Sequence, residues 1–153
     1  MKIKIISIGN NPPKWVQEIL IKYISRFDGH FKIELIELKS EKNFKSIEQK
    51  KIQETNKIFK FIDNDFIISL DENGSSCSSI DLSKKLSDWL QNFPKVTFII
   101  GGADGLDMKI LEKSNWVWSL SDLTLPHNIV KIILIEQLYR ASSILNNHPY
   151  HRE

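Results

Sequence analysis

The chain of 153 residues is 41% hydrophobic and 26% charged, which is typical of one globular domain and argues against disorder. Its one cysteine, Cys77, excludes an internal disulfide and a cysteine-based zinc site, and fits a reducing cytoplasm. Apolar runs are far shorter than the roughly 20 residues that span a bilayer. The first six residues form a strand-like pattern instead of an export signal. We therefore expect a cytoplasmic protein without a membrane segment.

The net charge of +2 is unevenly distributed along the chain. Residues 1–60 hold 13 basic and 7 acidic side chains, whereas residues 61–127 hold 5 basic and 10 acidic ones. A basic lobe could direct a polyanion to part of the surface. A solvated lysine-rich helix explains the same numbers, and charge alone favours this second interpretation.

The first predicted elements are a strand and a helix. Residues 3–8 alternate and are β-branched, which predicts a strand. Pro13 suits the first turn of a helix that extends to about Phe27, with Trp15, Ile19 and Tyr23 along one face. The further predicted elements are a strand at 31–38, a polar helix at 47–61, a strand at 66–70 ending in a polar turn at 71–74, a helix from a Ser79 or Asp81 cap to Leu90, a strand at 96–100, a helix at 107–113, a strand at 116–120 and a long helix at 126–145.

This alternation predicts an α/β fold, with a mostly parallel sheet covered by helices on both faces and a single domain over residues 1–153. In such sheets the ligand site lies in the loops at the carboxyl ends of the strands. The loops after Leu70, Ile100 and Leu120 are therefore the candidates.

The loop after Ile100 is a glycine turn, residues 101–105. Glycines let a backbone approach a ligand closely and offer N–H donors near a helix start. The turn lacks both the G-x-G-x-x-G spacing and the Lys-Ser or Lys-Thr of a P-loop, so a dinucleotide or nucleoside triphosphate is poorly supported. Taken alone, such a turn is more often structural.

The loop at residues 119–127 precedes the long helix, and Ser121 or Thr124 could cap that helix. A cap needs one residue, whereas this loop has nine and includes Leu123 and Leu125. Such a loop suits an adenine or a ribose. His127, at its end, indicates no more than a helix start by itself.

The last helix is apolar on nearly all sides, although a helix at the edge of a domain should show one apolar stripe. Apolar residues on two faces of this helix favour packing on its own sheet and on a second subunit, and hence a two-fold dimer. The alternative is a helix that is fully enclosed within one chain.

The tail, residues 148–153, is by default a frayed terminus. However, it holds two histidines, a tyrosine and an arginine, which are proton-transfer, stacking and anion-binding groups. No cluster has convincing metal spacing. Neither Cys77 nor any serine has a visible base partner, so nucleophilic catalysis is unsupported.

Taken together, these segments resemble the family of ribosomal large-subunit pseudouridine N3-methyltransferases, small members of the SPOUT superfamily of knotted methyltransferases. The resemblance covers nearly the whole chain and is carried by Gly9, Trp15, residues 34–37, Leu70, Asp71 and residues 101–105, 118–127, 136–141 and 147–153. Lys131 departs from the family, since an arginine is usual there. The segments 39–45 and 73–79 also depart from the family pattern.

The resemblance implies a C-terminal deep trefoil knot that holds S-adenosylmethionine. Carried over residue by residue, the cofactor contacts would be Leu70, Gly102, Ser121, Asp122, Leu123, Thr124, Leu125 and Pro126. Tyr150, His151 and Arg152 would be catalytic and would complete the site of the other subunit in a homodimer. No metal is implied.

The implied substrate is a pseudouridine in the decoding-centre hairpin of 23S rRNA, methylated at N3 in the assembled ribosome. Two alternatives stay open. One is a flavodoxin-like module that binds FMN or a nucleotide, and the other is a non-catalytic, ribosome-associated dimer.

Overall fold

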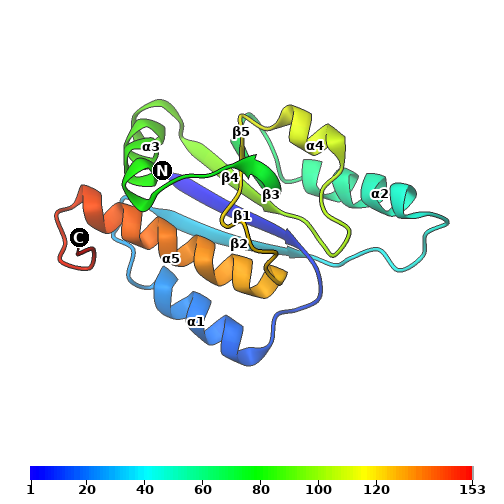
Figure 1. Cartoon of the computed structure of the whole chain (residues 1–153), viewed down its shortest axis with the longest axis horizontal. Coiled ribbons are helices and arrows are strands. Elements are labelled where there is room, and N and C mark those ends of the chain that lie inside the picture. Colours follow the sequence, from blue (N-terminus) through cyan, green and yellow to red (C-terminus); the bar gives the residue numbers. More distant parts are fainter. Residues whose placement is uncertain (153) are drawn as a thin grey trace.

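The computed structural model describes residues 1–152, and Glu153, the last residue of the predicted tail motif, lies outside the described residues. Strands and helices alternate along the chain (Figure 1). They are β1 (Lys2–Ile8), α1 (Lys14–Ile24), β2 (Lys32–Leu38), α2 (Ile47–Phe59), β3 (Phe66–Ser75), α3 (Ser79–Asn92), β4 (Lys95–Ile100), α4 (Met108–Lys113), β5 (Trp116–Trp118) and α5 (His127–Leu145).

The strands form one sheet in the order β2-β1-β4-β3-β5, and every described pair is parallel. At its centre Phe98 of β4 is in register with Ile5 of β1 and with Ile68 of β3. The predicted parallel α/β sheet is thus confirmed. The trefoil knot stays a prediction.

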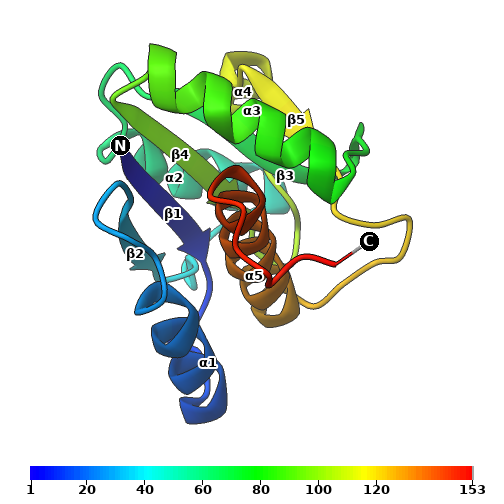
Figure 2. The same ribbon diagram turned by 90° about the vertical axis from the view of Figure 1, so that its left-hand side faces the viewer.

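Helices cover both faces of the sheet, as predicted. Figures 1 and 2 show α1, α3 and α5 on one face and α2 with α4 on the other. Alternate residues of β1 point to the two faces, because side chains alternate along a strand. Ile3 and Ile5 join the larger core under α1, α3 and α5, whereas Ile6 and Ile8 join the smaller core under α2 and α4.

Helix α5 lies between α1 and α3 (Figure 2). Leu134, Ile135 and Leu138 are fully buried, and every residue of this helix is buried or half-buried within the single chain. Part of its apolar surface is therefore buried within one chain, whereas Ile129 and Ile133 are half-buried and belong to neither core. The homodimer stays a prediction that needs other support.

Strand β3 continues to Ser75, so the prediction that it ends in a polar turn at 71–74 was wrong. The strand bulges after Leu70 and then pairs again with Trp118 of β5. Gly74 makes this return possible, because a Cβ there would lie 2.7 Å from the carbonyl oxygen of Val117. The Ser119 N–H donates to the Ser75 carbonyl at 3.0 Å and stabilises the renewed pairing of β3 with β5.

Two predicted helix caps were also wrong. The Oγ of Ser78, rather than Ser79 or Asp81, caps α3 by accepting from the Asp81 N–H at 3.1 Å. Helix α5 follows Pro126 and has no side-chain cap, so neither Ser121 nor Thr124 serves there. Proline holds a backbone conformation that is already suited to a helix start.

The packing face of α1 is one position away from the predicted one. Val16 and Leu20 are buried against the sheet, whereas the side chain of Trp15 is 51% exposed. Ile19 and Tyr23 are half-buried at the margin of this face. The prediction followed the large aromatic residues, but the smaller aliphatic ones fit closest to the sheet.

Candidate functional site

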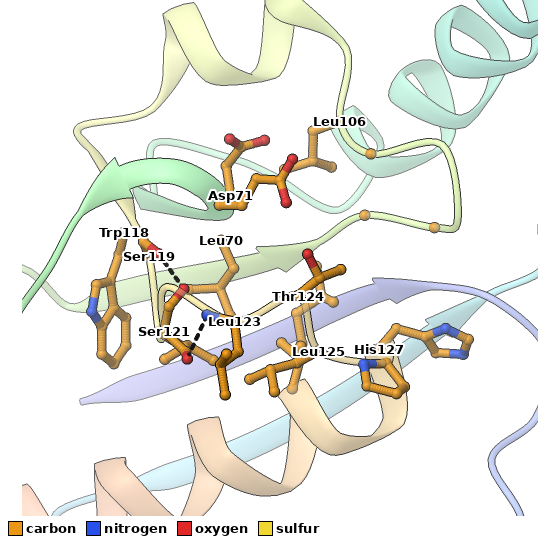
Figure 3. Close-up of a pocket in the computed structure, with 18 of the residues that line it drawn as sticks. Leu70, Asp71, Leu106, Trp118, Ser119, Ser121, Leu123, Thr124, Leu125 and His127 are labelled. Carbon is orange, nitrogen blue, oxygen red and sulfur yellow. Dashed lines mark hydrogen bonds between the residues drawn. The ribbon is translucent and has the colours of Figure 1, made fainter.

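A pocket of about 520 Å³ lies at the carboxyl edge of the sheet (Figure 3). The loops after β3, β4 and β5 and the first turn of α5 line it. These are the three loops that the element order selected. Among the predicted cofactor residues, those that line the pocket are Leu70, Gly102, Ser121, Leu123, Thr124, Leu125 and Pro126. Asp122 is exposed and is not among the lining residues.

The glycine turn folds tightly against the end of β1. The Gly105 N–H donates to the Gly102 carbonyl at 3.0 Å, and Gly105 has a φ of 75°, a conformation that favours glycine. A Cβ on Gly102 would lie 3.2 Å from the Ile8 side chain, and one on Gly101 would lie 2.9 Å from the Gly105 backbone. Apart from the methyl group of Ala103, the turn therefore offers only backbone to the pocket.

The loop before α5 forms the opposite wall. The Ser119 hydroxyl donates to the Ser121 carbonyl at 3.0 Å, and the Leu123 N–H donates to the Ser121 hydroxyl at 2.9 Å (Figure 3). These bonds hold the loop in a defined shape. Leu123 is nevertheless 73% exposed. An apolar group in open solvent at the pocket margin is available to cover a bound ligand.

The charge of the pocket comes from carboxylates. Asp71 and Glu72 line it at the end of β3, and Figure 3 shows Asp71 across the pocket from Thr124 and Leu125. The Asp71 carboxylate accepts from the Asn73 N–H at 2.9 Å, which orients it. The described lining residues include no lysine or arginine. The pocket therefore suits a cationic ligand and repels the phosphates of FMN or of a nucleotide.

His127 also lines the pocket, at the first position of α5. Its Nε2 lies 3.2 Å from where a Cβ on Gly9 would be, so the ring packs against the loop after β1. In Figure 3 the imidazole points away from Leu70 and Leu125. The ring thus joins the start of α5 to the end of β1.

The tail folds back onto the second half of α5. The Tyr150 hydroxyl lies 3.1 Å from Glu136 Oε1 and 3.4 Å from the Tyr23 hydroxyl. The guanidinium of Arg140 lies 4.9 Å from the centre of the Tyr150 ring, and its Nη1 lies 3.4 Å from Nδ1 of His151. The structure therefore brings Tyr150 and His151 together, whereas Arg152 is exposed.

Neither Tyr150, His151 nor Arg152 lines the pocket of its own chain. The tail binds at Glu136, nine residues beyond His127, which corresponds to about 13 Å along the helix axis. One chain thus assembles the predicted cofactor residues and the tail at two separate places.

Burial raises the pKa of the Tyr150 phenol, and the hydrogen bond with Tyr23 and the nearby Glu136 carboxylate act in the same direction. The phenol is therefore neutral at ordinary pH and donates to Glu136. The hydrogen bonds that Arg140 donates to the Glu136 carboxylate raise the pKa of Arg140, which keeps that guanidinium charged. In this arrangement Tyr150 is a hydrogen-bond donor and a poor proton acceptor.

Sequence reasoning did not identify Asp71, Glu72 and Glu136 as site residues. The signal for the first two was their position directly after the apolar part of β3, at the edge where the ligand loops gather. The signal for Glu136 was its i,i+4 spacing from Arg140, whose Nη2 lies 2.6 Å from Glu136 Oε1.

Within residues 1–152, no group of three or more histidine, cysteine or acidic side chains is placed to hold a metal ion. In the same part of the chain, none of the helices is long and apolar enough to cross a membrane.

Comparison with known proteins places this geometry in context. The model of the SPOUT methyltransferase family matches residues 1–151. The chain is 39% identical over the full length of both sequences to the ribosomal RNA large subunit methyltransferase H of Methylobacillus flagellatus. It is 40% identical, again over both full lengths, to the protein of the same name from Neisseria meningitidis.

Two solved structures share the fold. One is described as an RNA methyltransferase from Bacillus anthracis, with a TM-score of 0.51 at 14% identity over 99% of this chain and 98% of that one. The other is a methylase family protein from Neisseria gonorrhoeae, with a TM-score of 0.55 at 13% identity over 99% of this chain and 86% of that one. At these identities the likeness concerns the fold alone.

Proposed function

Because the chain belongs to the SPOUT methyltransferase family, we propose that it transfers a methyl group from S-adenosylmethionine to N3 of a pseudouridine in 23S rRNA. The acceptor would lie in the decoding-centre hairpin of the assembled ribosome, and the enzyme would act in the cytoplasm. Relatives that match over their full length carry the name of ribosomal RNA large subunit methyltransferases, which supports an rRNA substrate.

The observation that carries the proposal is the acidic pocket at the carboxyl edge. S-adenosylmethionine carries a positive sulfonium and an ammonium, and the Asp71 and Glu72 carboxylates offer charge of the opposite sign. The glycine turn offers backbone for the adenosine, and the apolar Leu70 and Leu125 side chains offer a surface for the adenine. The same charge argues against the flavodoxin-like alternative.

The reaction requires that the acceptor be positioned and that one proton be removed. S-adenosylmethionine supplies an electrophilic methyl group, so the N3–H proton of the acceptor must leave as the new N–C bond forms and the sulfonium becomes a thioether. His151 would accept that proton, and Arg152 would stabilise the negative charge that develops on the base. The raised pKa of Tyr150 favours His151 over Tyr150 in this role.

These tail groups would act on the pocket of a second subunit, which makes a homodimer part of the proposal. Its support is the separation between the pocket and the tail along α5. A chain that places its two sets of site residues apart can join them in a symmetric pair, because each subunit then donates what the other lacks.

The test is mass spectrometry of 23S rRNA nucleosides from cells with and without the gene. We expect N3-methylpseudouridine to disappear when the gene is removed and to return with the wild-type gene. An unchanged signal would exclude the proposed reaction.

Calorimetry with S-adenosylmethionine, FMN and GTP separates the alternatives, since binding of FMN or GTP alone would favour the flavodoxin-like module. If the protein binds ribosomes but transfers no methyl group, it is the non-catalytic dimer.

A further inference from the structure

Residues 39–51, which we call the lysine-rich segment, join β2 to the first turns of α2. They lie at the carboxyl edge of the sheet, because β2 is parallel to the strands whose ends line the pocket. The segment reaches the pocket loop directly, since Lys50 Nζ lies 2.6 Å from Oδ2 of Asp104 in the glycine turn. This ion pair has side chains that are 11% and 30% exposed. The segment is thus a neighbour of the proposed cofactor site.

The segment has a defined shape. The buried carboxylate of Glu54 accepts hydrogen bonds from the Ser40 hydroxyl at 2.8 Å and from the Glu41 N–H at 3.1 Å. The Gln49 side chain accepts from the Lys45 N–H at 2.8 Å, and Ser46 caps α2. These bonds fasten the turn to α2. The backbone that carries its outward side chains is therefore held in place.

The outward side chains are lysines around an aromatic ring. Phe44 is 42% exposed, and Lys42 and Lys45 on either side of it are also exposed. Among residues 1–152, the ammonium groups of these two lysines form no ion pair, whereas Lys57 is paired with Glu41. The ammonium of Lys50 lies 5.3 Å from the centre of the Phe44 ring. Packing in the core therefore does not explain why Phe44 is present, and ion pairs do not explain why Lys42 and Lys45 are present.

We propose that Lys42, Phe44 and Lys45 form a docking surface for RNA beside the pocket. The two ammonium groups would contact backbone phosphates, and an unpaired base would stack on the Phe44 ring. This inference rests on the proposed function, since the RNA is the rRNA that carries the acceptor base. The ammonium groups of Lys42 and Lys45 are complementary in charge to RNA phosphates. Residues 61–127, which supply most of the pocket, carry an excess of acidic side chains and would repel a polyanion. The lysine-rich segment would supply the attraction that the pocket lacks.

The experiment measures binding of the full-length protein to purified, assembled ribosomes from bacteria that lack the gene, at several salt concentrations. The variant K42Q/K45Q should bind about five- to tenfold more weakly at low salt, and the plot of log affinity against log salt should become shallower by about 1–2. F44A should weaken binding about fivefold without changing that slope, and F44W should restore it. The affinity for S-adenosylmethionine, measured by calorimetry, should stay unchanged in all of them.

A matched control removes two lysines elsewhere, in K84Q/K95Q. Lys84 is on α3 and Lys95 is at the amino end of β4, with side chains that are 72% and 42% exposed. If K42Q/K45Q binds the assembled ribosomes as K84Q/K95Q does, with the same salt slope, the docking surface is wrong while the proposed function stands. If the wild-type protein binds S-adenosylmethionine but neither binds nor methylates these assembled ribosomes, the proposed function fails and the docking surface fails with it.

Discussion

The ammonium of Lys131 lies 2.8 Å from both carboxylate oxygens of Glu37, and so joins the first turns of α5 to the end of β2. The lysine side chain is 3% exposed, and the Ser7 hydroxyl donates to the same carboxylate at 2.7 Å. An arginine is usual at position 131 in the family that the sequence resembles. The contact keeps the pocket end of α5, with His127 and Val130, in place over the sheet.

The first prediction concerns this buried ion pair. Lys131→Met should lower the free energy of unfolding by about 3 kcal/mol, because it leaves the Glu37 carboxylate partly buried without a counter-charge. Lys131→Arg should cost less than about 1 kcal/mol, since the charge and the donors are kept. Urea denaturation measures both. Equal stability of the two variants would show that the ion pair contributes nothing.

The second prediction tests the bulge of β3. Gly74→Ala should destabilise the protein by about 1–3 kcal/mol, because the new Cβ would meet the backbone of β5 at 2.7 Å. Gly29→Ala is the matched control, since nothing lies within 4 Å of a Cβ there, and its effect should be within about 0.5 kcal/mol. Thermal unfolding of both variants gives the comparison. A neutral Gly74→Ala would contradict the close approach of the two strands.

The third prediction concerns the charge of the pocket. Asp71→Asn should weaken binding of S-adenosylmethionine about tenfold, equivalent to roughly 1.4 kcal/mol, because a carboxylate that faces the sulfonium or the ammonium is neutralised. S-adenosylhomocysteine has no sulfonium charge, so a smaller loss for that ligand would identify the sulfonium as the partner of Asp71. Calorimetry with both ligands decides this.

Asp88→Asn is the control for this experiment, because Asp88 is an exposed residue of α3 that does not line the pocket. It should bind both ligands as the wild type does. An Asp71→Asn variant that binds S-adenosylmethionine as tightly as Asp88→Asn would refute the electrostatic argument for the cofactor.

The fourth prediction tests whether the tail acts on the other subunit. Arg152→Ala should lower turnover by about 100-fold with little change in cofactor affinity, because Arg152 would stabilise charge in the transition state. Gly102→Val should abolish cofactor binding, because its side chain would collide with Ile8 and displace the turn. Co-expression of the two inactive variants should restore roughly a quarter of the wild-type activity, since half of the dimers then carry one intact site.

No recovery in this mixture, with both variants shown to be folded by circular dichroism, would mean that the tail serves its own chain. Equal loss of turnover and of cofactor affinity in Arg152→Ala would contradict the role given to the guanidinium.

The fifth prediction follows from the raised pKa of Tyr150. If Tyr150 donates a hydrogen bond and does not accept the proton, Tyr150→Phe should keep the wild-type pH dependence of kcat/KM. A folded-state pKa above the unfolded value of about 10 stabilises the neutral phenol below that pH, and this contribution is lost as the pH rises further. The wild type should therefore lose more stability than Tyr150→Phe above pH ~10. Loss of the acidic limb of the rate profile in Tyr150→Phe would identify Tyr150 as the base.

The sequence alone determined the alternation of strands and helices and the loops that gather at one edge. Short β-branched runs such as residues 96–100 predict buried strands wherever they occur, and parallel strands necessarily end at the same edge. These are local properties and their direct geometric consequence. The predicted cofactor residues other than Asp122 line one pocket for this reason.

Only the tertiary structure decided features that depend on contacts distant in the sequence. Gly74 looks like a turn residue until β5 lies against it, and which side chains of α5 are buried becomes defined only when α1 and α3 lie on either side of it. The charge of the pocket and the placement of Tyr150 on Glu136 likewise join side chains from separate elements. The hydrophobic periodicity of a segment predicts which of its faces is buried, but not which other segment covers that face. The covering segment is defined only when the elements pack together.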